Sequence, residues 1–118
     1  FSLLRQAKYE SAELALKEFL DTHSGEKLAG NARYWLGETY YVRRAYVLAA
    51  ETFLEAFEFD REGVKAPDSL LKLGMSLAAL GKGKEACAAF GKLAQEYPEA
   101  TDEIKRSLER QFTKSSCR

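Results

Sequence analysis

The chain is poor in the residues on which disulfide scaffolds, metal sites and catalysts usually depend. Its 118 residues include two cysteines, two prolines and one histidine, and no apolar run approaches the ~20 residues of a membrane span. Cys87 and Cys117 are too few for a disulfide-rich scaffold and lack the spacing of metal ligands. His23 has no cysteine or serine partner that the sequence nominates, and no phosphate loop, zinc motif or nucleophile elbow occurs. We therefore predict no cofactor, no metal and no enzymatic activity.

An excess of one charge is also missing. Eighteen Lys and Arg balance eighteen Asp and Glu, so the formal net charge is zero at pH 7. Binding to nucleic acid or to an acidic membrane needs a concentrated excess of cations, and the balance argues against both. Because 46% of the residues are hydrophobic and 31% are charged, we expect one domain folded around a core. No stretch after Phe1 resembles a secretory signal, and we expect Phe1 to lie partway through a structural unit, with any signal upstream of it.

What the chain does contain is an internal repeat. Three alanines lie 37 residues apart, each followed four residues later by a large apolar residue: Ala12 and Leu16, Ala49 and Phe53, Ala86 and Phe90. The dipeptides Leu36-Gly37 and Leu73-Gly74 recur at the same interval. Ala, Leu, Glu and Lys are abundant and favour helix. The repeat therefore predicts an all-α solenoid of helical hairpins.

Apolar residues at spacings of three and four predict where the helices lie. The expected helices span 1–6, 9–22, 29–43, 46–60, 67–80, 83–97 and 100–113. They make up a partial first repeat (1–25), a second repeat (29–62), a third repeat (66–99) and a capping helix (100–113), all in a single domain. The apolar side of the capping helix, with Ile104, Leu108 and Phe112, is expected to shield the third repeat from water.

Small residues recur at the places where the helices of a pair should cross. In the third repeat, Gly74 leaves no side chain on the inner side of the first helix, and Ala86 has a small one on the second. The two backbones can then approach closely while Phe90 fills the space beside the crossing. The second repeat has the same residues in the same places.

The pattern of Leu-Gly followed at fixed offsets by Ala, Phe and Pro resembles the tetratricopeptide repeat. The third repeat carries it at Leu73, Gly74, Leu77, Gly81, Ala86, Phe90 and Pro98, and the second at Leu36, Gly37, Tyr40, Ala49, Phe53 and Ala56. The second repeat departs at Arg44, where the family usually has the turn glycine, and at Arg61, where it usually has proline.

A narrower resemblance is carried by particular segments. NARYWLGETYYVRRAYVLAAETF, KAPDSLLKLGMSLAALGKGKEACAAF and the closing YPEA are similar to the C-terminal domain of the YbgF/CpoB family, the periplasmic proteins of the Tol-Pal system. The similarity covers roughly residues 3–100. Its departures lie in turns and include Ala7 in place of a turn glycine.

This similarity implies a periplasmic adaptor. Members of the family bind TolA, and some link the Tol machinery to a class A penicillin-binding protein. They thereby coordinate peptidoglycan synthesis with outer-membrane constriction in cell division. Members also carry an upstream coiled coil that trimerises, so we expect a trimeric parent and a monomeric fragment. Two other interpretations stay open: a BamD-like repeat subunit of the outer-membrane protein assembly machinery, and a thiol-redox enzyme that uses Cys87.

The first helix of each pair is expected to line the concave side of such a stack. If the family geometry holds, the partner-binding residues there are Asn31, Tyr34, Glu38 and Tyr41 from the second repeat, and Asp68, Leu71, Lys72, Met75 and Ala78 from the third. Their mixture of aromatic, amide and charged groups suits a partner helix or an extended peptide. The alternative is that Tyr34 and Tyr41 merely cover the edge of the core.

Two further expectations concern single side chains. We expect Trp35, the largest side chain, to pack in the core between neighbouring repeats, with an interface anchor as the alternative. In an oxidising periplasm an isolated cysteine pair is usually joined, so Cys87 and Cys117 are expected to staple the last helix to the stack. The alternative is one buried and one exposed thiol. The groove lacks the Lys and Asn arrangement of chaperone-binding relatives, which argues against a co-chaperone role.

Overall fold

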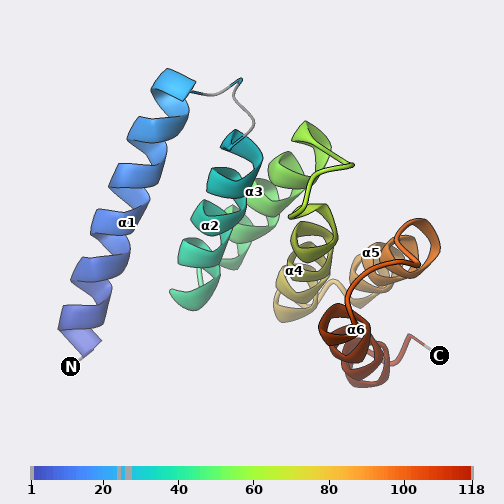
Figure 1. Ribbon diagram of the computed structural model, residues 1–118. Helices are drawn as coiled ribbons and strands as arrows, with labels where there is room; N and C mark the ends of the chain where they lie inside the picture. Colours follow the sequence, from blue (N-terminus) through green and yellow to red (C-terminus); the bar gives the residue numbers. More distant parts are fainter. Residues whose placement is uncertain (1, 24, 26–27, 118) are drawn as a thin grey trace.

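The fold is built from α-helices, as the repeat pattern predicts. The computed structural model describes residues 2–23, 25 and 28–117, with side chains from residue 7 onward. These residues form six helices in succession (Figure 1): α1 (Ser2–His23), α2 (Ala29–Val42), α3 (Tyr46–Phe59), α4 (Ala66–Ala79), α5 (Gly83–Glu96) and α6 (Asp102–Lys114). Within the described residues there is no strand, and the prediction of an all-α helical-repeat fold is confirmed.

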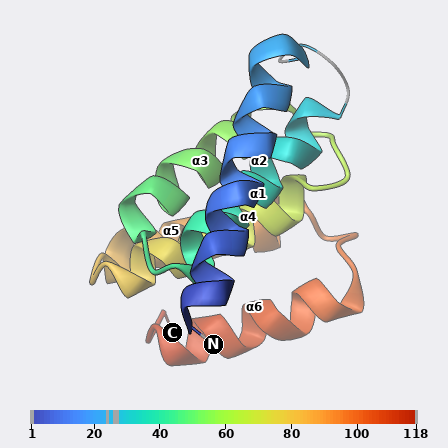
Figure 2. The same ribbon diagram turned by 90° about the vertical axis from the view of Figure 1, so that its left-hand side faces the viewer.

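The helices form two hairpins, α2 with α3 and α4 with α5, which α1 and α6 flank at the two ends. Each helix packs on the next one along the chain. In addition, α2 contacts α4 and α4 contacts α6, whereas the described Cα atoms of α3 and α5 stay more than 8 Å apart. The first helices of successive pairs are thus closer together than the second helices. The concave side is therefore formed by α2, α4 and α6 and the convex side by α3 and α5, which lie to the left of α2 and α4 in Figure 2.

The core consists of two hydrophobic clusters joined at one residue. The first contains the buried side chains of Tyr34, Leu36, Tyr40, Ala49 and Phe53, with Leu16 and Leu20 of α1 packed against them. The second contains those of Phe57, Ala66, Leu70, Leu71, Ala86, Ala89, Phe90, Leu93 and Leu108. Leu73 of α4 packs against both clusters, so the two hairpins share a continuous interior.

Each hairpin is closed by a glycine that faces a phenylalanine. A Cβ atom placed on Gly37 of α2 would lie 2.7 Å from the buried ring of Phe53 on α3. A Cβ atom on Gly74 of α4 would meet the ring of Phe90 on α5 in the same way, 2.7 Å from its Cδ1 atom. Carbon atoms in proteins do not approach so closely without displacement. The predicted close crossing of the two backbones is confirmed.

The turn within each hairpin keeps one backbone conformation although one turn lacks the family glycine. Gly81, between α4 and α5, has a φ of 78°, in the left-handed region that glycine adopts readily. Arg44 occupies the corresponding place between α2 and α3 and has a φ of 63°. The departure of Arg44 from the repeat pattern therefore leaves the turn intact, at a steric cost of about 1 kcal/mol.

The first helix differs from its prediction. The pattern predicts two helices, 1–6 and 9–22, whereas α1 runs without a break from Ser2 to His23. Ala7, which stands where the family has a turn glycine, favours helix and disfavours a left-handed turn, so the helix continues through it. Phe1 lies outside the described residues. The other helix bounds agree with the predictions to within two residues.

One carboxylate ties α1 to α2. Glu13 pairs with Lys17 on the same helix at 2.7 Å and with Arg43 just after α2, and it accepts a hydrogen bond from the Tyr40 hydroxyl at 3.2 Å. Hydrogen bonds from Lys17 and then from Arg43 lower the pKa of Glu13 from 4.5 to about 2. The carboxylate is thus ionised at neutral pH and holds groups from both helices.

Replacing Gly74 with alanine should place a methyl group against the Phe90 ring and lower the free energy of unfolding by about 1–3 kcal/mol. Gly91 on α5 is the matched control, because nothing lies within 4 Å of a Cβ atom added there. Alanine is the better helix former, so Gly91→Ala should raise the free energy of unfolding by up to about 1 kcal/mol. Urea denaturation followed by circular dichroism measures both. Equal stabilities of the two variants would contradict the close crossing.

Replacing Glu13 with glutamine should lower the free energy of unfolding by about 1 kcal/mol at pH 7, the size expected of a partly exposed ion pair. Since the folded pKa is below the unfolded value of 4.5, the stabilisation is complete above that pH and is lost as the pH falls towards 2. The difference between wild type and variant should shrink over this range in urea titrations. Glu18→Gln, which removes a carboxylate from an exposed part of α1, is measured alongside as the matched control, and a pH-independent Glu13 difference would exclude the carboxylate charge as its cause.

Candidate functional site

On the concave side, α2 presents one narrow exposed stripe. The side chains of Asn31, Trp35 and Val42 are exposed and that of Glu38 is half-buried, at successive steps of four, three and four residues. These steps keep them on one line along the helix. The stripe is narrow because α1, α3 and α4 all pack on α2. Asn31 and Glu38 are among the predicted partner-binding residues. Trp35 was predicted for the core, with an interface anchor as the alternative, and Val42 was not considered.

A second stripe, on α4 and the residue before it, faces the stripe of α2 on the concave side. We call the surface between these two stripes the groove. Lys65, Asp68, Lys72 and Met75 are half-buried and lie at steps of three or four residues. The Lys72 ammonium lies 2.9 Å from Oε1 of Glu38, which joins the two helices across the groove. It also lies 4.8 Å from the centre of the Tyr41 ring. The predicted residues of both helices thus meet here, but two of the charges neutralise each other.

Trp35 is the most prominent apolar group of the groove. Its side chain is 47% exposed, so the expectation that it packs in the core between repeats is wrong. The indole lies edge-on to Tyr34, with ring centres 5.1 Å apart, and the Lys65 ammonium lies 5.2 Å from its ring centre. No ion pair joins Lys65 to a carboxylate of the described residues. The groove therefore holds an exposed indole beside a cation whose ring contacts are with Tyr34 and Trp35.

Two of the predicted groove residues are buried instead. Tyr34 is 7% exposed and packs on Phe53, with ring centres 5.7 Å apart. Burial, and then the nearby charges of Glu38 and Asp68, raise the pKa of Tyr34, so its hydroxyl remains protonated. Leu71 is 5% exposed and belongs to the core cluster that includes Leu108 of α6. Both were expected to contact a partner. Both face the interior instead, because the rotation of 100° per residue points these two positions towards the neighbouring helices.

The remaining predicted residues lie towards the edge of the groove. Tyr41 is half-buried and lies edge-on to Tyr46, with ring centres 5.4 Å apart. Met75 and Ala78 are half-buried and pack against the second core cluster. They also border a depression closed on its far side by Gln111 and Lys114 of α6. The capping helix thus forms one wall of the concave side.

A cavity adjoins the groove at the end of the first hairpin. It has a volume of about 520 Å³ and is lined mainly by the N-terminus of α2 and the loop between α3 and α4. Asn31 and Lys65 belong both to this lining and to the groove. The exposed side chains of Leu28 and Val64 lie at the same place. The groove therefore continues into a recess with apolar walls.

In the part of the chain that the structure describes, no group of His, Cys, Asp or Glu is arranged to hold a metal ion. His23 lies at the end of α1, stacked on Phe19 at 4.7 Å and with its Nδ1 atom 2.6 Å from the Thr22 hydroxyl. None of the helices described combines the length and the apolar character needed to cross a bilayer.

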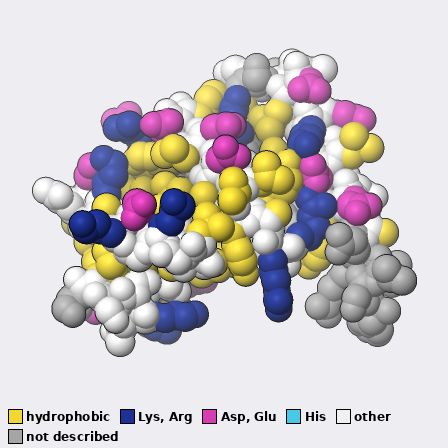
Figure 3. Space-filling view, turned by 180° about the vertical axis from the view of Figure 1, so that it is seen from behind, with side chains coloured by type: hydrophobic (Ala, Val, Ile, Leu, Met, Phe, Trp, Pro, Cys, Tyr) yellow, Lys and Arg dark blue, Asp and Glu magenta, His cyan; other side chains and the backbone are white. Residues whose placement is uncertain are grey.

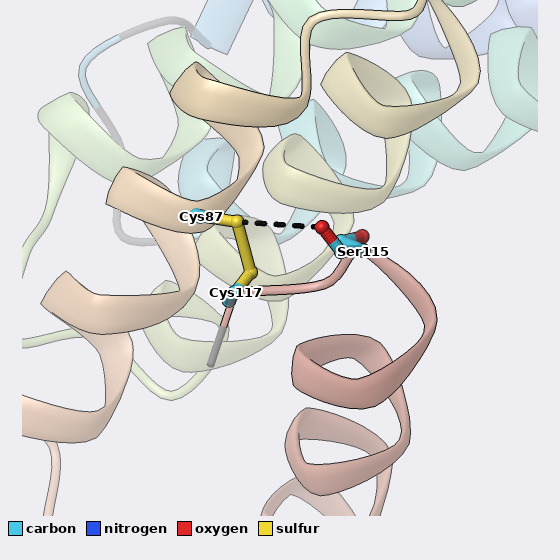
Figure 4. The surroundings of a disulfide bond; sticks show 3 residues. All are labelled: Cys87, Ser115 and Cys117. Atoms are coloured by element: carbon cyan, nitrogen blue, oxygen red, sulfur yellow. Dashed lines mark hydrogen bonds between the residues drawn. A yellow bond between two sulfur atoms is a disulfide. The ribbon is translucent and has the colours of Figure 1, made fainter.

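The two cysteines join α6 to α5. Cys87 of α5 and Cys117 form a disulfide that closes a sequence separation of 30 residues (Figure 4). The chain reaches α5 by turning back at Ser116, whose φ is 55°, while the Cys117 amide donates a hydrogen bond to the Phe112 carbonyl at 2.9 Å. The expected disulfide is supported, and both thiols of the chain are used in it. At its other end α6 is capped by Thr101, whose hydroxyl accepts a hydrogen bond from the Ile104 amide at 3.3 Å.

The repeat is matched by a known family. Residues 68–100, which span most of α4, all of α5 and the connection to α6, match the model of the tetratricopeptide repeat. No curated protein matches the chain in sequence. The match supports a tetratricopeptide-type domain, and domains of this type generally bind other proteins without catalysing a reaction.

Replacing Cys117 with serine should lower the free energy of unfolding by roughly 3 kcal/mol, because the unfolded chain regains the freedom of a loop of about 30 residues. Urea denaturation without reductant measures the change. Wild type in dithiothreitol should fall to the stability of the Cys87→Ser, Cys117→Ser double variant, which reductant should leave unchanged. Two free thiols per unreduced wild-type chain would contradict the bond.

Proposed function

We propose that this domain is a non-catalytic protein interaction module that docks a helix or an extended segment of a partner in the concave groove between α2 and α4. The observation that carries the proposal is the exposed indole of Trp35 on the concave stripe of α2. Large aromatic side chains dominate the energetics of protein interfaces when they are free to be buried by a partner. Lys65 beside it adds a cation that a partner's carboxylate can reach.

The surroundings of Trp35 also suit such a partner. Glu38 and Lys72 pair across the groove at 2.9 Å. Charged groups of this kind contribute more to the orientation of a bound segment than to its affinity. The adjoining cavity of about 520 Å³ offers an apolar recess for a side chain of the segment. These features and the tetratricopeptide match support protein binding rather than nucleic-acid or membrane binding.

We propose further that the domain works in the periplasm as part of a Tol-Pal system, with TolA as its partner. The support is the resemblance of its segments to the YbgF/CpoB family and the disulfide, which persists in an oxidising compartment. In this role the domain would also take part in coupling a class A penicillin-binding protein to outer-membrane constriction. A BamD-like scaffold is the second candidate and would need further repeats outside the chain.

Trp35→Ala should weaken binding to purified TolA by about tenfold or more, because it removes the main apolar contact. Isothermal titration calorimetry measures the dissociation constant. Leu14→Ala is the matched control, since it shortens an even more exposed apolar side chain on α1 and should leave affinity unchanged. The melting temperatures of both variants should stay close to that of the wild type.

The outcomes separate the two levels of the proposal. If wild type does not bind TolA but captures another envelope protein through Trp35, TolA is the wrong partner and the groove remains the binding site. If Trp35→Ala and wild type bind every partner equally, the groove itself is excluded.

A further inference from the structure

The convex side carries an unpartnered helix face of unusual composition. The outward side chains of α3 are exposed and define what we name the α3 outer face: Val47, Leu48, Glu51, Leu54, Glu55 and Glu58. This face points away from the groove, on the side where α3 and α5 lie. The view from behind shows hydrophobic side chains gathered over the middle of this side, with acidic and basic ones around them (Figure 3).

The first unusual property is the amount of exposed apolar surface. Val47, Leu48 and Leu54 are 59%, 48% and 42% exposed. The helices α5 and α6 show the ordinary alternative: no large hydrophobic side chain is exposed on either. Single exposed apolar residues are common on proteins, whereas several grouped on one helix face are typical of a surface that another molecule covers.

The second property is charge of one sign. The sequence of α3 contains Glu51, Glu55 and Glu58 and no lysine or arginine. None of the ion pairs formed by the described residues involves these three glutamates. At a rotation of 100° per residue they run along the middle of the face, with Val47 and Leu54 on one side and Leu48 on the other. A partner must therefore present bases along its centre and apolar groups on both sides.

These two properties select one class of occupant. Phosphates of nucleic acids and of anionic lipids would be repelled by three glutamates that form no ion pair with any residue the structure describes. A second copy docked by the same face would set glutamate against glutamate, since a twofold interface pairs a surface with itself. A helix with Lys or Arg at every third or fourth position and Leu-type residues beside them satisfies both the charge and the apolar edges.

We propose that the α3 outer face is a second binding surface, which takes a basic amphipathic helix of another protein. It is independent of the concave groove, so the domain can hold two segments at once on opposite sides. The apolar contacts supply affinity, and the glutamates select a basic partner and accelerate its association.

The test uses a fluorescein-labelled model peptide of 18 residues, made of Lys and Leu at the helical spacing described, and the whole domain. Fluorescence anisotropy should detect binding that weakens as salt is raised, because the exposed charges are screened. Glu51→Lys combined with Glu55→Lys should weaken binding by about tenfold or more, and Glu51→Gln with Glu55→Gln by less. The amide signals of α3 should shift on titration in heteronuclear NMR spectra.

Three matched measurements decide the outcome. Glu10→Lys with Glu18→Lys on α1 changes the net charge equally and should leave binding unchanged, as should Trp35→Ala in the groove. Equal loss in the α1 variant, or loss in the Trp35 variant, would overturn the proposal. A free wild-type domain that sediments as a dimer and dissociates on Leu48→Ser with Leu54→Ser would also overturn it, because the face would then bind a second copy. Circular dichroism must show that each variant is folded.

Discussion

The distance between the two helices of a hairpin is the constraint on which the rest of this structure depends. It is set by a glycine on the first helix and a phenylalanine ring on the second, at Gly37 with Phe53 and at Gly74 with Phe90. A hairpin closed at this point has little freedom to change its crossing angle. Two hairpins of equal shape then stack with a regular curvature, and the curvature brings α2, α4 and α6 together on one side. The groove is a consequence of that packing.

The hairpins could be predicted from the sequence because small and aromatic residues at a fixed period report a local contact. The continuity of α1 could not be predicted from the repeat, because the repeat pattern places a turn at residue 7. In this chain Ala7 stands where the family has the turn glycine, and the preference of alanine for helix carries α1 through this position. In the site the error was one residue. Tyr34 and Trp35 are adjacent aromatics, and which of them faces the groove depends on the rotation of α2 against three neighbouring helices, which periodicity alone leaves undefined.

A formal charge of zero conceals an uneven distribution of charge over the surface. On the concave side, acid and base pair across the groove at Glu38 and Lys72. On the convex side, the glutamates of α3 have no cationic partner on their own helix. The balanced composition therefore excludes a strong electrostatic potential over the whole molecule, but the potential can still differ from one side of the surface to the other. Two sides that differ in this way can discriminate between ligands that a net-charge argument would treat alike.

The position of Leu73 between the two hydrophobic clusters affects which helices of the domain unfold together. Helices in a stack of this kind touch few neighbours, so the ends can loosen while the middle stays folded. Leu73 is packed against both hydrophobic clusters, and it makes the first hairpin's interior continuous with the second's. A contact shared by both clusters couples the unfolding of one hairpin to that of the other. The terminal helices differ, because α6 is held covalently by its disulfide while α1 depends on side-chain contacts with α2.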